Sequence, residues 1–419
     1  MRHNIYKLIL LPAMLLICSI AFAQEITQIT GKVEDASTGS PLQFASVMLK
    51  GSTTSTVTNR DGRFSFKIPS GSQEDSIMFS YMGYRNVVVP VSGIKPNKLL
   101  RISLEPSGFN IRSITVRTSD AEELFKSAFS SNAIKLNYST KPSGMSGFYR
   151  EIIKKGNRYL SLSEAVVDIM KQSYTSLAPD NIAIYKGRGN VNRNASDTVF
   201  LQLQGGPVTS MYLDIVKDPF IATDMIVATE YYNFRMGPMM YMDDMNIYTI
   251  DFNQIPGVDE ILYRGRIYVE SQTLAVVRIE FEMNVEEHKD AWKKFVRKKP
   301  DDLELGMDWA KYQINYRQQG EKWYMDYARA DLRFNAKYKG KWLRSRYDII
   351  TELAITDTDY PAALKIPYGQ RFRMKDILQK KVSDFEDDNF WEGYNIIEPD
   401  EKIENIINRI IRQLRKERE

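Results

Sequence analysis

The chain offers few side chains of the kinds that usually carry out catalysis. Its 419 residues include two histidines, His3 and His288, and a single cysteine, Cys18. A catalytic zinc site uses two or three histidines, or histidine with cysteine, and a serine or cysteine nucleophile needs a basic partner such as histidine. His288 lies in the polar stretch Val285–Asp290, beside the basic stretch Lys293–Lys299. We therefore interpret His288 as a solvated surface residue.

Two glycine-containing stretches resemble catalytic or phosphate-binding motifs without matching them. The nucleophile elbow Gly-x-Ser-x-Gly has its nearest counterpart in Gly144-Met145-Ser146-Gly147, which fails the spacing. Gly187-Arg188-Gly189 lacks the third glycine and the following helix of a phosphate-binding loop. Neither stretch predicts a catalytic or cofactor-binding residue.

The stretch Asn59-Arg60-Asp61-Gly62 has the look of the middle of a calcium loop. An EF-hand needs an acid at its first position and a glutamate at its twelfth, and these positions fall on Val57 and Ile68. We predict instead a tight turn with Gly62 at positive φ. The sequence thus predicts no metal site.

Acidic pairs occur at Asp243-Asp244, Asp301-Asp302 and Asp387-Asp388. Neighbouring residues on a strand point to opposite faces, so adjacency does not predict a carboxylate dyad. A hydrolase that relies on carboxylates alone, such as a glycosidase, needs two of them about 5–10 Å apart. That reaction class stays open as an alternative.

Methionine and aromatic residues gather in one segment of the chain. The members are Phe234, Met236, Met239, Met240, Tyr241, Met242 and Met245. Methionine adapts to irregular apolar surfaces. The cluster is therefore either core packed at a sheet edge or an apolar groove for a lipid, peptide or glycan, and the first interpretation is favoured.

The chain begins with the pattern of a secretory signal peptide. A basic start with Arg2 and Lys7 precedes an apolar run over residues 8–20, and Ala21-Phe22-Ala23 provides a cleavage site after Ala23. The apolar run is shorter than the roughly 20 residues that span a bilayer. Lipidation at Cys18 is the alternative, but the bulky Ile17 before it is atypical. We expect export to the periplasm or the periplasmic side of an outer membrane.

The charge balance excludes a strongly basic nucleic-acid binder. The formal charge is +4, and removal of residues 1–23 takes away two basic residues and no acidic one, which leaves about +2. Basic and acidic residues alternate along most of the chain. No apolar run after the signal peptide is long enough for a transmembrane helix, so the expected partners are an envelope protein or an apolar ligand.

Short alternating strands predict a β-sandwich over the first part of the mature chain. The segments Arg63–Ile68, Ser76–Tyr81 and Leu100–Leu104 alternate apolar and polar residues with period two, which buries one face. Turn residues such as Thr38-Gly39-Ser40-Pro41 and Pro69-Ser70-Gly71 separate such runs. This pattern is typical of a sandwich.

The same part of the chain resembles the carboxypeptidase-regulatory-like domain. The resemblance rests on several stretches in the right order: Thr30–Asp35, Thr38–Leu42, Ala45–Val47, Lys50–Ser52, Thr58–Phe64 and Phe79–Tyr84. It covers roughly residues 27–105 and implies a transthyretin-like sandwich that is not itself catalytic. Domains of this family are found as the first module of outer-membrane receptors and other envelope proteins of Bacteroidetes-type bacteria.

The rest of the chain is predicted to be mainly antiparallel β. Hairpins are expected over Tyr149–Met170 and Ile261–Met283, and a three-stranded meander over Trp309–Arg317, Lys322–Phe334 and Lys341–Ile355. A helix is expected after the capping box Ser119–Glu122, another near Pro207–Val216, and an amphipathic one over Asp400–Glu419.

Two further resemblances concern this larger region. One rests on the order of a strand at Ile114–Val116, a helix like Ala121–Phe129, a strand at Phe148-Tyr149 and the stretch Phe390–Asn395. This order resembles the region that follows the regulatory-like domain in a family of uncharacterised envelope proteins. The hairpin Tyr263–Glu270 with Thr273–Glu282 resembles those of periplasmic lipoprotein-carrier sheets, which curve around acyl chains.

We therefore expect a mainly β protein with the following organisation: signal peptide 1–23, transthyretin- or immunoglobulin-like sandwich 24–106, linker 107–118, antiparallel β-rich α+β domain 119–399 and C-terminal helix 400–419. The favoured function is that of a non-enzymatic envelope protein with a sandwich spacer or docking module and a larger partner- or ligand-binding domain. The alternatives are a lipid or lipoprotein carrier and a carboxylate-only hydrolase. No catalytic, cofactor-binding or metal residue is predicted.

Overall fold

The structure is a computed structural model of the chain. It describes residues 26–69, 71–72, 75–95, 98–107, 121–191, 205–219, 230–242, 245–286, 288–296, 301–383, 390–391 and 393–418. The predicted signal peptide with Cys18, most of the predicted linker 107–118, Ser119 of the capping box and the pairs Asp243-Asp244 and Asp387-Asp388 lie outside these residues.

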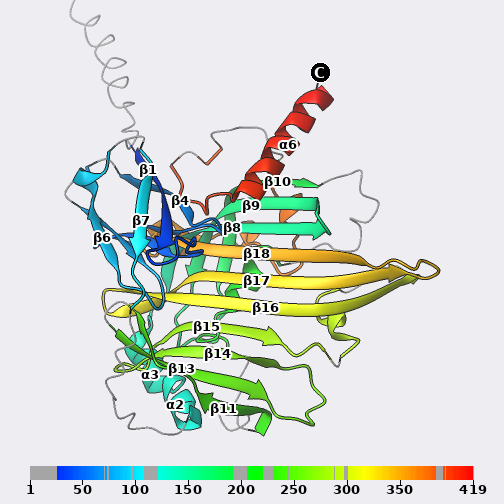
Figure 1. Cartoon of the computed structure of the whole chain (residues 1–419), viewed down its shortest axis with the longest axis horizontal. Coiled ribbons are helices and arrows are strands. Elements are labelled where there is room, and N and C mark those ends of the chain that lie inside the picture. Colours follow the sequence, from blue (N-terminus) through cyan, green and yellow to red (C-terminus); the bar gives the residue numbers. More distant parts are fainter. Residues whose placement is uncertain are drawn as a thin grey trace, which may run out of the picture.

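Seven strands form the sandwich that the alternating pattern predicts (Figure 1). They are β1 (Ile26–Asp35), β2 (Ser46–Leu49), β3 (Ser55–Val57), β4 (Arg63–Pro69), β5 (Ser76–Ser80), β6 (Val87–Pro90) and β7 (Leu100–Leu104). One sheet has the order β4-β1-β7 and the other β3-β2-β5-β6. Their inward residues, including Val33, Phe64 and Phe79, form one buried core. The turn before β4 has Gly62 at φ 72°, as predicted.

An 11-stranded sheet forms the body of the larger region, and all its pairings are antiparallel. The order is β10-β9-β8-β18-β17-β16-β15-β14-β13-β11, with β12 also paired to β13. The strands are β8 (Ser143–Lys155), β9 (Arg158–Lys171), β10 (Asn181–Val191), β11 (Tyr232–Met236), β12 (Met240–Met242), β13 (Met245–Gln254), β14 (Tyr263–Glu270), β15 (Val276–Met283), β16 (Leu303–Gln319), β17 (Lys322–Tyr338) and β18 (Ser345–Asp357). The mainly β fold class is thus confirmed.

The predicted hairpins and the meander are present with tight connections. Gly156, Gly320 and Gly340 occupy the turns at φ 56°, 58° and 77°, a conformation that glycine adopts without steric cost. The last strand begins later than predicted, at Ser345 in place of Lys341. Ser345 pairs with Ala336, and the earlier residues have no partner in the β17–β18 ladder.

Helices cover one face of the large sheet, which we call the helix face. They are α2 (Ala121–Ala128), α3 (Ser131–Asn137) and α4 (Gly206–Met211). Short 3-10 turns complete the structure: η2 (Val91–Gly93), η3 (Ala291–Lys294), η4 (Pro361–Lys365), η5 (Tyr368–Gln370) and η6 (Leu378–Lys380). The helix predicted over Pro207–Val216 is therefore shorter, because the chain turns after Met211 and Asp214 is drawn into a buried ion cluster described below.

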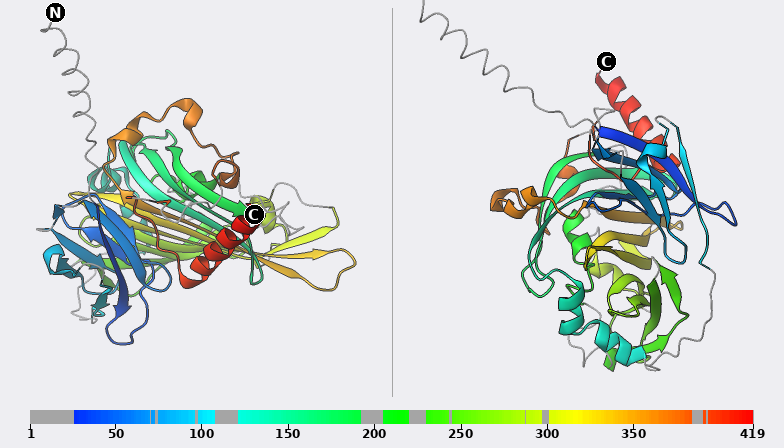
Figure 2. Two further views of the ribbon diagram at one scale, coloured as in Figure 1. Left: turned by 90° about the horizontal axis from the view of Figure 1, so that it is seen from above. Right: turned by 90° about the vertical axis from the view of Figure 1, so that its left-hand side faces the viewer.

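The sandwich lies on the opposite side of the sheet, which we call the sandwich face. The right-hand view of Figure 2 shows the sandwich and helices α2 and α3 on opposite sides of the sheet. The C-terminal helix α6 (Glu401–Arg418) also packs on the sandwich face. Its residues Ile403, Ile406 and Ile407 are buried with side chains of β8, β9 and β18. The predicted amphipathic helix is thus present, and its first turns belong to the sheet core.

Candidate binding cleft

A row of charged side chains crosses the whole sandwich face of the large sheet. Register places one residue of each strand directly beside the next, and the charges alternate in sign except at one glutamine. In strand order the row reads Arg188, Glu164, Arg150, Glu352, Arg329, Gln313, Glu280, Arg266, Asp251 and Arg235. Opposite charges that face each other across strands stabilise the pairing, so this charge row reinforces the register of the sheet.

The first half of the charge row is buried. Arg150 and Glu164 are 1% and 0% exposed, and they form an ion pair at 2.7 Å. Arg188 binds the other oxygen of Glu164 at 2.9 Å. Burial would raise the pKa of Glu164, but Arg150 and Arg188 outweigh that effect and lower it. Burial likewise opposes the charge of Arg150, and Glu164 and Glu352 raise its pKa. Glu164 and Arg150 therefore stay ionised inside the protein.

A segment of the same chain whose described residues form no helix or strand covers this buried half. We call residues 390–400, of which Glu392 is not described, the strap. The ring of Trp391 packs edge-on against Phe148 at 5.3 Å, with the guanidinium of Arg188 5.0 Å from the Trp391 ring. Arg150 donates a hydrogen bond of 2.8 Å to the carbonyl oxygen of Ile397. An arginine of the charge row thus binds the strap backbone directly.

The sandwich contacts both the strap and the sheet. The side chain of Asn395 accepts a hydrogen bond from the backbone amide of Lys67 and donates one to its carbonyl, at 2.8 and 3.0 Å. Thr56 donates to the carbonyl of Ile396 at 3.0 Å. Arg317 of β16 donates to the hydroxyl of Ser55 at 2.8 Å. These buried polar contacts fix the sandwich against the sheet.

Phe44 provides an aromatic contact between the sandwich and strand β17 of the sheet. Its ring stacks on Tyr327 with centroids 5.0 Å apart and an interplanar angle of 21°. Its backbone has φ 61°, a left-handed conformation that is costly for a residue with a Cβ atom. The ring contact holds the residue in place in spite of that cost.

We expect Phe44→Gly to be more stable than Phe44→Ala by about 1 kcal/mol, because only glycine relieves the left-handed backbone. Both variants should be less stable than the wild-type protein by about 1–2 kcal/mol, since both lose the ring stack. Urea denaturation of the purified chain measures the three free energies of unfolding. An alanine variant at least as stable as the glycine variant would contradict the strained backbone.

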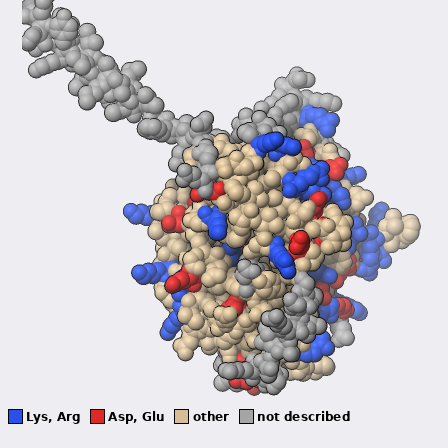
Figure 3. Space-filling model, turned by 60° about the vertical axis from the view of Figure 1, so that its left-hand side comes forward, with Lys and Arg blue, Asp and Glu red and all other residues tan. Residues whose placement is uncertain are grey.

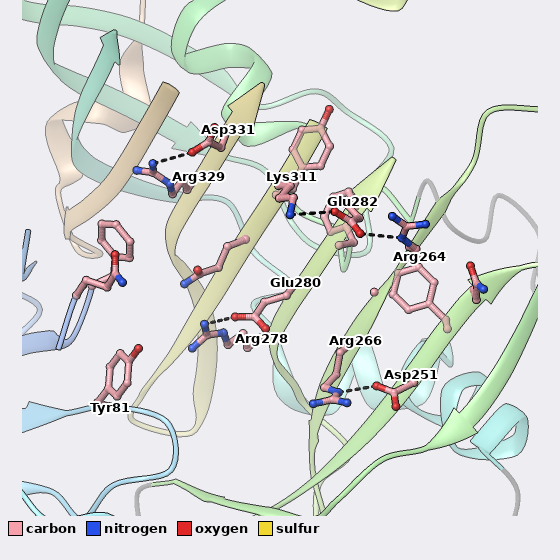
Figure 4. Close-up of a pocket in the computed structure, with 18 of the residues that line it drawn as sticks. Tyr81, Asp251, Arg264, Arg266, Arg278, Glu280, Glu282, Lys311, Arg329 and Asp331 are labelled. Carbon is pink, nitrogen blue, oxygen red and sulfur yellow. Dashed lines mark hydrogen bonds and ion pairs between the residues drawn. The ribbon is translucent and has the colours of Figure 1, made fainter. Parts of the chain in front are cut away.

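The second half of the charge row, apart from Arg235 at its end, lines an open cleft of about 1010 Å³ between the sheet and the sandwich (Figure 4). The floor comes from β13–β17 and includes Asp251, Arg266, Glu280, Gln313 and Arg329. Loops of the sandwich supply the facing wall. The wall residues are Gln43, Phe44, Arg60 and Tyr81.

The carboxylates of the cleft are held in ion pairs. Asp251 pairs with Arg266, whose hydrogen bond is the main cause that lowers the pKa of Asp251. Glu280 pairs with Arg278, and Asp331 pairs with Arg329 at 3.2 Å.

Glu282 belongs to a second alternating line beside the charge row. Arg264 and Lys311 bind it at 2.7 and 3.3 Å. Burial would raise the pKa of Glu282, but Arg264 and Lys311 outweigh burial and lower it. A glycosidase acid needs a raised pKa, so the paired carboxylates of the cleft suit binding better than acid catalysis.

The cleft lining carries an excess of positive charge. Its cations are Arg60, Arg264, Arg266, Arg278, Lys311 and Arg329, and its anions are Asp251, Glu280, Glu282 and Asp331, which gives a net charge of +2. The Nε atom of Arg278 is buried without a hydrogen-bond partner among the described residues. The arrangement therefore favours a ligand that brings negative charge and hydrogen-bond acceptors.

Two of the stretches singled out in the sequence contribute to this cleft: Arg60 comes from the Asn59–Gly62 turn, and Arg266 and Glu280 come from the hairpin over residues 263–282. The other candidate residues lie elsewhere. His288 is half-buried in the loop before η3. Gly144–Gly147 belongs to strand β8, where no nucleophile elbow is formed. Gly187 and Gly189 lie in β10 on either side of the paired Arg188. Asp301 and Asp302 are exposed before β16.

The methionine-rich segment forms the edge of the sheet and packs against the helix-face core. Phe234, Met236, Met240 and Met245 are partly buried against this core, and Met242 is buried within it. The ring of Phe234 stacks on Phe125 of α2 at 4.4 Å. The segment thus serves as core at a sheet edge, which is the favoured interpretation of its sequence.

A buried ion cluster fixes the chain after α4 to the helix face. Lys171 binds Asp214 at 2.6 Å and Asp180 at 2.8 Å, and Tyr316 donates a hydrogen bond of 2.8 Å to Asp214. Side chains of α2, α4 and the following turns pack on the same face. The part of this face under the described helices is therefore filled by the protein itself.

The described part of the chain was compared with the requirements of a metal site and of a membrane-spanning helix. There, no group of three or more His, Cys, Asp or Glu side chains is arranged to hold a metal ion. Within the same residues, no helix combines the length and apolar character needed to cross a membrane. Figure 3 shows acidic and basic side chains interspersed over one side of the molecule.

Neither the charge row nor the cleft was predicted from the sequence. A signal existed, because Arg150 and Glu164 occupy positions between apolar residues in the strand patterns of Phe148–Ile153 and Leu160–Ile169. Charges at positions that should be buried indicate ion pairs. What the sequence does not contain is the register that makes distant strands neighbours.

Comparisons with known proteins agree with the sandwich. Residues 29–116 match the family described as CarboxypepD_reg-like domain, so this part of the chain is such a domain and the resemblance is confirmed. The chain is also 41% identical over 85 residues to the TonB-dependent receptor SusC of Bacteroides thetaiotaomicron. That match covers 20% of this chain and only 8% of the receptor.

Solved structures show only a distant likeness. A LolA superfamily protein from Nitrosomonas europaea is 12% identical, with a TM-score of 0.21, over 60% of this chain and 99% of that protein. A DUF1329 family protein from Desulfovibrio piger is 11% identical, with a TM-score of 0.22, over 59% of this chain and 98% of that protein. MucB is 10% identical, with a TM-score of 0.19, over 61% of this chain and 95% of that protein. TM-scores this low do not establish a common fold.

Proposed function

We propose that the protein is a non-enzymatic binding protein of the cell envelope and that it holds a partner or ligand in the cleft between the sandwich and the large sheet. The observation that carries the proposal is the lining of the cleft. It combines a concave space of about 1010 Å³ with ordered charges and the aromatic wall residues Phe44 and Tyr81. Concave sites with convergent polar groups are the usual place for ligands.

Location in the envelope rests on two features. The predicted signal peptide would direct the chain to the periplasm or the periplasmic side of an outer membrane. The CarboxypepD_reg-like domain is shared with a TonB-dependent receptor, of which this chain covers a small part. Both features support an envelope role without naming the partner.

The sandwich has a proposed role in shaping the site. It contributes Gln43, Phe44, Arg60 and Tyr81 to the wall. It is fixed to the strap through Asn395 and to the sheet through Arg317. A module that only held the larger region at a distance would not require these contacts. We therefore assign it a docking role in which it completes the cleft.

Photo-crosslinking tests the location of the site. A benzophenone amino acid at Gln43, which is exposed in the cleft wall, should give a defined adduct in the native host. The same amino acid at Gln370, exposed in η5 and absent from the cleft lining, is the matched control. Mass spectrometry identifies the adducts. Equal labelling at both positions, or none at Gln43, would refute the cleft as the binding site.

A further inference from the structure

We infer that the ligand of the cleft is an extended polypeptide segment that is acidic and contains aromatic residues, supplied by a partner protein. This inference rests on the proposed function, because it names the ligand of the same cleft. The strap is the model for this ligand, because it is the segment with which the protein covers the buried half of the same charge row.

The strap has a distinct composition. Its sequence, Phe-Trp-Glu-Gly-Tyr-Asn-Ile-Ile-Glu-Pro-Asp, contains three acidic residues, three aromatic residues and no lysine or arginine. It has no regular secondary structure between Asn395 and Asp400. Its backbone hydrogen-bonding groups are therefore available to the surrounding side chains.

Donors from both domains bind the strap backbone. Lys67 donates to the carbonyl oxygen of Tyr394 at 3.0 Å, and Asn59 donates to that of Pro399 at 3.0 Å. Together with Thr56 and Arg150, they give the strap four backbone contacts that do not depend on its side chains. Trp391 adds an aromatic anchor beside Arg188. Backbone contacts with side-chain anchors are the usual mode of extended-peptide recognition.

The open cleft repeats these features. Arg266 and Arg278 present guanidinium groups from the sheet, as Arg150 and Arg188 do under the strap. Phe44 and Tyr81 offer aromatic surface on the sandwich side, with Tyr81 labelled in Figure 4. The lining has a net charge of +2, which is complementary to an acidic segment.

The two halves are continuous. Arg60 and Arg329 line the cleft and also the small space beneath the strap, next to Ile397 and Asp400. A second segment in the cleft would meet the same two arginines that the strap already approaches. This continuity favours a polypeptide over a glycan, because a polypeptide is the occupant that this face already holds.

Fluorescence anisotropy with a defined probe tests the inference. The probe is a fluorescein-labelled peptide with the sequence of residues 390–400 and blocked ends, added to the mature full-length chain. We expect saturable binding that weakens at least about tenfold in Lys311→Glu and in Arg278→Gln, because each removes a charge-assisted contact. Lys311 is exposed, so its replacement should leave folding intact.

Arg235→Gln is the matched control, since Arg235 belongs to the charge row but is absent from the cleft lining and is 83% exposed. Binding to it should equal binding to wild type. A second peptide carries Gln, Gln and Asn in place of Glu392, Glu398 and Asp400, and it should bind at least about tenfold more weakly. Absence of binding by the first peptide, or equal binding by both peptides or by Lys311→Glu, overturns the inference.

The crosslinking experiment separates the two proposals. A polypeptide adduct at Gln43 whose linked segment is acidic and aromatic supports both. A glycan or lipid adduct at Gln43, or binding of polygalacturonate without binding of the peptide, overturns the peptide inference and leaves the cleft as the site. Absence of any adduct specific to Gln43 removes the proposed function itself.

Discussion

Replacement of Arg150 by leucine is expected to lower the free energy of unfolding by about 3–5 kcal/mol, because each of the buried carboxylates Glu164 and Glu352 then keeps only one of its two arginine partners. Arg150 is 1% exposed, pairs with Glu164 at 2.7 Å and approaches Glu352 at 3.8 Å. The substitution also removes the hydrogen bond to the strap at Ile397. The ion pairs and this hydrogen bond exist only in the folded state, so their removal destabilises the folded state relative to the unfolded one.

Arg235→Leu provides the comparison within the same charge row. Arg235 is 83% exposed and pairs with Asp251 at 3.5 Å, so its removal should cost less than about 0.5 kcal/mol. Guanidinium chloride unfolding curves of the wild-type protein and both variants measure these values. A similar decrease in the free energy of unfolding in the two variants would show that burial does not determine how much an arginine of the charge row stabilises the protein.

Replacement of Glu151 by glutamine is expected to stabilise the protein at alkaline pH by up to about 4 kcal/mol. Glu151 lies on the helix face, is 2% exposed and has Tyr149 as its hydrogen-bond donor at 3.2 Å. Burial raises the pKa of Glu151 to about 8, against a smaller lowering effect from Tyr149. The neighbouring hydroxyl of Ser163 is buried and has no partner among the described residues.

The sign of the pH dependence follows from proton uptake. The unfolded chain releases the Glu151 proton near pH 4.5, and the folded chain releases it near pH 8. Between these values the folded state binds more protons than the unfolded state, so stability falls as pH rises and levels off above about pH 8. Below about pH 4.5 both states are protonated, and Glu151 imposes no cost.

Unfolding free energies of wild type and Glu151→Gln across pH 4–9 provide the measurement. Their difference should be small at pH 4 and grow to its full size near pH 8. Glu304→Gln, at an exposed position of β16, should show a constant difference from wild type and serves as the control. A constant difference for Glu151→Gln would mean that the carboxyl has the same pKa in the folded and the unfolded state, which would contradict the effect of burial.

Local sequence patterns account for most of the fold. Period-two alternation and turn glycines predict the sandwich strands and the long hairpins, because both signals act between residues close in the chain. The meander from Leu303 to Asp357 is a clear example, since its turns contain Gly320 and Gly340. One boundary differs: the ladder between β17 and β18 begins at the pair Ala336–Ser345, although β17 itself continues to Tyr338.

The candidate site could not be predicted in the same way. Arg188 and Arg235 stand at opposite ends of the charge row, which forms only after ten strands pair in an order that brings β8 beside β18. The cleft further depends on loops of the sandwich that lie more than 150 residues away in the chain from its floor. Such long-range geometry produces no periodic pattern in the sequence. Charged residues between apolar ones, such as Arg150 and Glu164, do indicate the buried half of the charge row.

The strap also has a consequence for the order in which the protein folds. Asn59 and Lys67 of the sandwich bind Pro399 and Asn395, which are separated from them by 340 and 328 positions. During synthesis the sandwich strands are complete long before these partners emerge. The strap-binding edge of the sandwich therefore stays uncovered until residues 390–400 close over it. Contacts of such high sequence separation form slowly. We expect refolding to show a late phase in which Trp391 becomes buried, after the two sheets have formed.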